Sequence, residues 1–156
     1  MNYDLIETGP VVTKEVINNF ERENNISLPE DYIEFLLKNN GGMFIYDYVN
    51  FDFKDKLGDN TAIVDIFYGI NYPADVYDLK TMLNRTRDRM PNNIIPIAND
   101  PGGNKICISI KGEDYGKVYF WDHEFEADED EKPDYRNLSL IANSFTEFFK
   151  LLKVNE

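Results

Sequence analysis

In the middle of the chain, hydrophobic and polar positions alternate in a way that predicts three strands. β-branched residues gather at 94–97, isoleucines occupy every second position of 106–110, and residues 118–121 read Val-Tyr-Phe-Trp. A period of two is typical of strands, because successive side chains point to opposite faces of a sheet. Residues 99–104 and 111–116 contain glycines, with a proline in the first stretch, and predict tight reversals. We expect the three strands to form the centre of an antiparallel sheet.

Residues 13–24 have the pattern of an amphipathic helix. Thr13 is a residue type that caps helix N-termini, because its side chain can accept a hydrogen bond from the first turn. Val16, Ile17 and Phe20 then fall on one face, at the spacing of a helix. We expect a first helix that ends at about Asn24 and packs this face against the core.

A second helix is predicted after residues 27–30, whose sequence Ser-Leu-Pro-Glu has the form of a capping box with proline in the first turn. Asn40, Gly41 and Gly42 provide a stop, since glycine readily adopts the left-handed conformation at a helix C-terminus. The hydrophobic positions expected to face the core are Tyr32, Ile33, Leu36 and Leu37.

The stretch before the predicted sheet has the pattern of a hairpin followed by a third helix. Residues 43–53 and 61–68 are rich in aromatic and β-branched side chains without helical spacing, and 54–60 form the expected turn. Residues 75–88 place hydrophobic side chains on one helical face before Pro91 redirects the chain. These side chains are Val76, Leu79, Met82 and Leu83.

A last helix is predicted near the C-terminus. Its hydrophobic face consists of Phe145, Phe148, Phe149 and Leu152. The start of this helix is open between two interpretations, because Ser144 begins a second capping box whereas Leu138 and Ile141 extend the hydrophobic face backward. The chain has no internal repeat and no linker rich in Pro, Gly or Ser. We therefore expect one α+β domain over residues 1–156, with helices packed on a mostly antiparallel sheet.

Composition and charge narrow the classes of partner. The 156 residues include 42% hydrophobic and 14% aromatic side chains, which is material for a substantial core, and they carry a net charge of −13. The sequence pI is near 4.4. An acidic surface repels phosphate, so neither nucleic acid nor an anionic membrane is the expected partner. A basic protein fits the charge better.

The N-terminus and the cysteine content favour a cytoplasmic location. The chain begins Met1-Asn2-Tyr3-Asp4, without the basic and apolar regions of a signal peptide, and one cysteine forms no internal disulfide. No apolar run approaches the ~18 residues that span a bilayer. We therefore expect a cytoplasmic protein.

Candidate catalytic and metal-binding residues are few. His123 is the only histidine and Cys107 the only cysteine, which leaves one possible Cys-His pair and too few ligands for zinc. Cys107 lies inside a predicted strand, where a free cysteine is most often a small buried residue. Asp122 and Glu124 are the best placed carboxylate pair, but a solvated charged face is the favoured interpretation of them. We expect no catalytic residue, no metal and no cofactor.

Two loops resemble ligand-binding motifs but lack the residues that such motifs need. Residues 100–104, Asp-Pro-Gly-Gly-Asn, are followed neither by Lys-Ser/Thr nor by the helix of a phosphate loop. An EF-hand beginning at Asp122 needs glycine at its sixth position and glutamate at its twelfth, where the chain has Ala127 and Pro133. We expect the first loop to be a turn that links two strands.

Residues 122–134, here called the acidic segment, follow the last predicted strand. Eight acids stand in this segment against a single cation, Lys132, so it carries more than half of the net charge of the chain. Clusters of like charge usually remain in water. On the strand just before it, Tyr119 and Trp121 share one face and either close the core, which we favour, or anchor a partner.

Two sets of residues, one in each half of the chain, have an order and spacing similar to those of a known family. The N-terminal set is Phe20-Glu21, Ile26, Leu28-Pro29, Asp31-Tyr32, Phe35-Leu36 and Asn40-Gly41-Gly42. The C-terminal set is Asn99-Asp100, Gly103-Asn104, Gly116-Lys117-Val118-Tyr119, Trp121-Asp122-His123-Glu124, and Ala142-Asn143-Ser144-Phe145 with Phe148. On these residues the chain resembles the SUKH superfamily, the Smi/Knr-like immunity proteins of bacterial polymorphic toxin systems.

The resemblance implies an α+β fold and a non-enzymatic protein that binds and blocks a cognate toxin, often a nuclease, inside the producing cell. We expect a basic nuclease toxin domain as the partner, held by charge complementarity. The candidate toxin-binding residues are Trp121, Asp122, Glu124, Glu126, Asp128 and Glu129. The alternative is a regulatory or scaffold binding module of the same fold without a toxin. A carboxylate-dependent hydrolase using Asp122 or Glu124 is a more distant third.

Overall fold

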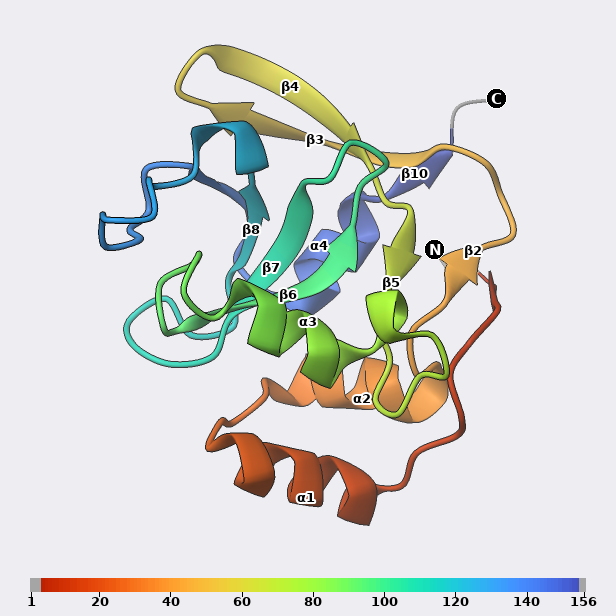
Figure 1. Cartoon of the computed structure of the whole chain (residues 1–156). Helices are drawn as coiled ribbons and strands as arrows, with labels where there is room; N and C mark the ends of the chain where they lie inside the picture. The colour runs from red at the N-terminus through yellow and green to blue at the C-terminus, as the bar shows by residue number, and fades with distance from the viewer. Residues whose placement is uncertain (1–3, 155–156) are drawn as a thin grey trace.

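The computed structural model describes residues 4–154 and is built around a five-stranded antiparallel sheet (Figure 1). Its strands, in spatial order, are β5 (Ile66–Phe67), β6 (Ile94–Asn99), β7 (Lys105–Ser109), β8 (Val118–Trp121) and β9 (Leu138–Ala142). The three strands predicted from the alternating pattern are confirmed as its adjacent central members β6, β7 and β8. In the turn between β6 and β7, the Asp100 carboxylate accepts the backbone N–H groups of Gly102 at 2.9 Å and Asn104 at 2.8 Å. This loop is the structural turn that its sequence predicts.

Two smaller antiparallel sheets complete the strand pairing in the described part of the chain. One contains β1 (Leu5–Ile6) and β2 (Met43–Phe44), and the other has the order β10 (Lys153–Val154), β3 (Val49–Asp55), β4 (Gly58–Ile63). The predicted hairpin is therefore present as β3 and β4, with Lys56 and Leu57 in its turn. Both strands of the hairpin were predicted too long. The start of the first predicted strand forms β2, which pairs with β1, and the end of the second forms β5, which pairs with β6.

Four α-helices flank these sheets, and they are α1 (Lys14–Asn24), α2 (Glu30–Lys38), α3 (Leu79–Thr86) and α4 (Phe145–Leu151). Figure 1 shows α4 behind the central sheet, α1 and α2 together at one end, and the β3–β4 hairpin across the other end. The first helix begins as predicted, since Thr13 Oγ1 accepts the backbone N–H of Val16 at 3.2 Å. On this helix Ile17 and Phe20 are buried, and Val16 is partly buried against the main core.

The capping box predicted at residues 27–30 is wrong. Helix α2 begins at Glu30 with Pro29 at its N-cap, and no side chain of the described residues caps it. The Glu21 carboxylate holds the preceding turn instead, by accepting the backbone N–H of Leu28 at 2.8 Å. Leu37 was also misplaced, because it is exposed while Phe35 packs between Phe67 and Phe145.

The stop after α2 is confirmed at Gly41, which lies two residues beyond the C-cap Asn39. The helix ends at Lys38 and Asn39 is extended, whereas Gly41 has a φ of +77°. A Cβ atom at Gly41 would lie 2.7 Å from the carbonyl oxygen of Phe67. Only glycine combines this conformation with such a close approach to β5.

The third helix is shorter than the sequence pattern indicated, and the fourth begins at the later of the two positions that the sequence left open. Residues Asp75–Tyr77 form a 3-10 turn, η1, and Val76 on it is exposed, so α3 begins only after the cap at Asp78. Helix α4 begins after Ser144, whose hydroxyl accepts the backbone N–H of Glu147 at 3.0 Å. The stretch containing Leu138 and Ile141 is strand β9, because pairing with β8 takes precedence over a helical extension.

The side chains of β6, β7 and β8 point alternately to two faces of the central sheet. The inner face belongs to the main hydrophobic core and consists of Ile95, Ile97, Ile106, Ile108, Val118 and Phe120. The outer face carries a separate small cluster of Met90, Ile94, Cys107, Tyr119 and Trp121. This arrangement is an α+β fold with helices on a mostly antiparallel sheet, as predicted. Among residues 4–154, no helix has both the length and the apolar character needed to cross a bilayer.

Candidate functional site

The acidic segment, residues 122–134, leaves the sheet at the end of β8 and returns before β9 (Figure 1, blue). Its first residues form a short 3-10 turn, η2 (His123–Phe125), and the remainder contains no regular helix or strand. Such a loop has no regular ladder of backbone hydrogen bonds. Its shape therefore depends on side chains that fasten it to the sheet.

The two ends of the segment are joined to each other. The backbone N–H of Asp122 donates to the carbonyl of Asn137 at 3.0 Å, and the Asn137 side-chain amide donates back to the carbonyl of Asp122 at 2.9 Å. Asn137 is buried at this point. The loop therefore starts and finishes at one place, directly beyond the last residue of β8.

The start of the segment is also tied to the β6–β7 turn. The Asp122 carboxylate caps η2 by accepting the backbone N–H of Glu124 at 3.0 Å. The backbone N–H of His123 donates to Asn104 Oδ1 at 3.1 Å, and Asn104 is itself bonded to Asp100. These hydrogen bonds of Asp122 and His123 thus hold η2 in place beside the β6–β7 turn.

A cation from outside the segment neutralises one of its acids. Arg89, in the loop after α3, makes two hydrogen bonds to the Glu126 carboxylate, at 2.9 and 3.0 Å. The same guanidinium lies over the ring of Trp121, 5.1 Å from the ring centroid. Arg89 therefore joins the acidic segment to the aromatic cluster of the outer face.

The far end of the segment is organised by Arg136. Its guanidinium donates to Glu131 at 3.1 Å and to Asp134 at 2.8 and 3.1 Å. These hydrogen bonds lower the pKa of Asp134 to about 2. Two more acids of the segment are therefore paired within the molecule.

The residue after the segment, Tyr135, is held by the carboxylate of Asp114. Tyr135 and Tyr119 donate their hydroxyls to Asp114 Oδ2 at 2.6 and 2.9 Å, and Ser109 donates to Oδ1 at 2.8 Å. The side-chain amide of Asn93 donates to the Tyr135 hydroxyl at 2.7 Å. Partial burial raises the pKa of Asp114, but the three hydroxyl donors outweigh this effect, so its pKa lies below the usual value.

After these pairings, four carboxylates of the segment point to solvent without a salt bridge in the described part of the chain. They are those of Glu124, Asp128, Glu129 and Asp130. Phe125 lies among them with 60% of its surface exposed. Phe125 is not among the residues predicted from the sequence to bind a partner, although a lone aromatic residue inside an acidic run indicates an exposed contact residue.

Trp121 does not present its ring to a partner, which corrects its selection as a candidate binding residue. It has 0% exposure and lies beneath Arg89, while Tyr119 is 9% exposed. Both residues belong to the interior, as the favoured interpretation expected. Trp121 is connected to the acidic segment through Arg89, which contacts both the Trp121 ring and the Glu126 carboxylate.

The residues considered for chemistry are not brought together. Cys107 is fully buried beside Met90 and pairs across the sheet with Tyr119, four positions before His123, and burial raises the pKa of its thiol. The Asp122 carboxylate is occupied by the backbone of Glu124, whose own side chain is exposed. Among the described residues, no group of three or more His, Cys, Asp or Glu side chains is arranged to hold a metal ion.

Comparison with known proteins agrees with the fold and the residue pattern. The sequence model of the SMI1 / KNR4 family (SUKH-1) matches residues 11–151. The chain is also 38% identical over 150 residues to the SPbeta prophage-derived uncharacterized protein YokK of Bacillus subtilis (strain 168), with 87% of this chain and 72% of that protein covered. The chain therefore belongs to the SMI1 / KNR4 family (SUKH-1).

Proposed function

We propose that this protein is an immunity protein that captures a cognate toxin, a basic nuclease domain, through the acidic segment. Membership of the SUKH family favours this role, because its members are generally non-enzymatic immunity proteins. One observation carries the choice of surface: the segment is fastened to the sheet at several points, yet four of its carboxylates remain exposed without a salt bridge to a described residue.

The acids of the segment divide into two roles in this proposal. Asp122 and Glu126 hold the loop, since each is engaged within the molecule. Glu124, Asp128 and Glu129 face the toxin. A basic surface that binds phosphate is complementary to such a field, and steering of this kind raises association from about 10⁵–10⁶ to 10⁸–10⁹ M⁻¹s⁻¹ at low salt.

Charge alone does not supply high affinity, which comes from a few buried side chains at the centre of an interface. Phe125 is suited to this role because the residue is 60% exposed on a turn that Asp122 and Asn104 hold in place. An exposed ring on a positioned backbone loses little conformational entropy when it enters a pocket. We assign Phe125 as the apolar anchor and the surrounding acids as the steering surface.

The first experiment is co-expression with the protein encoded by the neighbouring reading frame, scored for cell survival and for co-purification. Survival that depends on this chain, together with a stable complex, is the expected result. A neighbouring protein that is harmless, or that kills equally in the presence of this chain, would contradict the immunity role.

A second experiment tests the surface. Neutralising Glu124, Asp128 and Glu129 to Gln, Asn and Gln is expected to slow association with the toxin and to flatten its dependence on salt. The matched control neutralises Glu15, Glu34 and Glu147 on the helices, which changes the net charge equally. If both triple variants associate at the same rate and with the same salt slope, the acidic segment is not the steering surface.

A further inference from the structure

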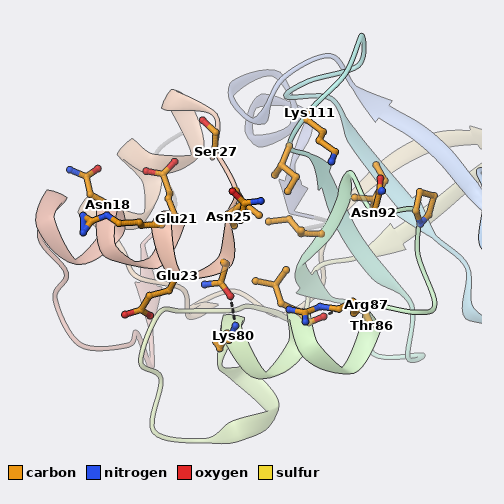
Figure 2. Close-up of a pocket in the computed structure, with 18 residues that line it drawn as sticks. Asn18, Glu21, Glu23, Asn25, Ser27, Lys80, Thr86, Arg87, Asn92 and Lys111 are labelled. Atoms are coloured by element: carbon orange, nitrogen blue, oxygen red, sulfur yellow. Dashed lines mark hydrogen bonds between the residues drawn. The ribbon is translucent and has the colours of Figure 1, made fainter.

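A groove with a volume of about 1010 Å³ opens between α1, α3 and the central sheet. Figure 2 shows its three walls, with Asn18, Glu21 and Asn25 on one side, Lys80 on α3 and Arg87 at its C-terminal end, and Asn92 and Lys111 on the sheet side. No residue of the acidic segment lines it. The groove is therefore a second surface of the molecule, separate from the one assigned to toxin binding.

The lining of this groove is cationic in an otherwise acidic protein. Four of the 16 Lys and Arg residues of the chain line it, against two acids, although the chain as a whole has a net charge of −13. The cations are Arg22, Lys80, Arg87 and Lys111, and the acids are Glu21 and Glu23. The carboxylate of Glu21 is already engaged within the molecule, because it accepts a hydrogen bond from the backbone N–H of Leu28. With four cations against two acids, the charged side chains that line the groove sum to +2, opposite in sign to the net charge of the chain.

The remaining lining combines apolar side chains with amides. Ile26 and Leu83 are half-buried and stand beside the buried isoleucines of the sheet. The side-chain amides of Asn18, Asn25 and Asn92 have no hydrogen bond to any described residue. An amide both donates and accepts, so these three match the N–H and C=O groups of a peptide backbone.

We propose that this groove binds an extended segment of a partner protein that carries both acidic and apolar side chains. Its acids pair with Arg87 and Lys111, and its apolar side chains contact Ile26 and Leu83, since all four residues line the groove. Nucleic acid fits less well, because the whole chain repels a polyanion and the apolar walls offer nothing to phosphate. This site does not depend on the immunity role of the acidic segment.

The test is fluorescence anisotropy with a labelled peptide of about ten residues in which Glu alternates with Leu and Ser, enough to span ~33 Å when extended. Wild-type protein is expected to bind it, more weakly as salt is raised. The double variant R87E/K111E is expected to bind the peptide at least about tenfold more weakly. It loses two partly exposed ion pairs with the peptide, and the new glutamates repel the acids of the peptide. Both residues are exposed, so the fold is expected to tolerate the change, and R87Q/K111Q provides a milder second variant.

The matched control is K54E/K56E on the β3–β4 hairpin, which makes the same change in net charge away from the groove and is expected to bind as wild type does. Absence of binding to wild type, an equal loss in both double variants, or equal binding of a peptide with Lys in place of Glu would each overturn the proposal. Sedimentation of the wild type, in addition, measures whether the protein self-associates. Self-association that R87E/K111E abolishes would show that a second copy of the chain occupies the groove, and would also overturn it.

Discussion

The two faces of the central sheet are built from the same three strands but are covered in different ways. The inner face packs against aromatic rings from other elements, as where Phe120 of β8 contacts Phe51 and Phe53 of β3, with ring centroids 6.5 and 4.6 Å apart. The outer face has a small cluster around Trp121, covered by polar contacts from Arg89 and Tyr135. The inner face forms part of the main hydrophobic core, which stabilises the fold. The outer face contacts the acidic segment, which we assign to recognition.

This difference implies two levels of stability. A continuous apolar interior is lost only when the whole domain unfolds, whereas a loop fastened by hydrogen bonds and a few exposed ion pairs can open locally. Cys107 and Trp121 are the only cysteine and tryptophan of the chain and both lie on the outer face. Thiol labelling and tryptophan fluorescence therefore report on that face in particular.

Phe148→Ala gives the largest expected effect, because it removes a fully buried ring of α4 from the main hydrophobic core, where it contacts Phe51 and Phe67. We expect a loss of roughly 3–5 kcal/mol in the free energy of unfolding, measured by denaturant titration. The matched substitution Phe125→Ala removes an exposed ring and is expected to leave the free energy of unfolding nearly unchanged. Equal losses in the two variants would remove the distinction between core and recognition surface.

Asp114→Asn is expected to destabilise the outer face by roughly 1–3 kcal/mol, since it replaces a charged acceptor shared by Tyr119, Tyr135 and Ser109. Labelling of Cys107 by a thiol reagent should become faster under native conditions, in excess of any change in global unfolding. Glu113→Gln, at an exposed neighbouring acid, is the control. Labelling that follows global stability alone would show that the outer face does not open independently.

The same carboxylate makes the outer face sensitive to acid. The pKa of Asp114 is lowered in the folded protein, so its stabilising contribution is fully present above the unfolded-state pKa of about 3.9. This contribution is lost as the pH falls through the lower folded-state pKa. Cys107 labelling, corrected for the reactivity of an unfolded control, is expected to rise in that acid range in wild type. Asp114→Asn should show a smaller rise, and an identical pH profile would exclude Asp114 as the group responsible.

Arg89→Ala gives the smallest expected effect on stability. Its ion pair with Glu126 is partly exposed, and such pairs contribute about 0.2–1 kcal/mol. The substitution also uncovers one side of the Trp121 ring, so we expect the tryptophan emission to shift to longer wavelength. Arg85→Ala on α3 removes an exposed cation without a salt bridge to any described residue and should leave the emission unchanged. An unshifted spectrum for Arg89→Ala would mean that the ring is covered by other groups.

Local patterns were sufficient for much of the fold. The alternation at residues 106–110 and 118–121, and the caps at Thr13 and Ser144, predicted elements that the structure contains. These signals concern neighbours within a few positions. Distant partners decided what a local pattern left open, as at Leu138 and Ile141, where pairing with β8 outweighs a pattern that also suits a helix.

The sequence by itself determined the fold class, the family resemblance and the position of the acidic run, because composition, periodicity and spacing are properties of the linear chain. Only the tertiary structure decided which acids of that run remain exposed. Glu126 is neutralised by Arg89, 37 positions away, and Tyr135 is held by Asp114, 21 positions away. Tertiary packing likewise buried Trp121 and left Phe125 at the surface, since exposure depends on what the rest of the chain brings alongside each residue.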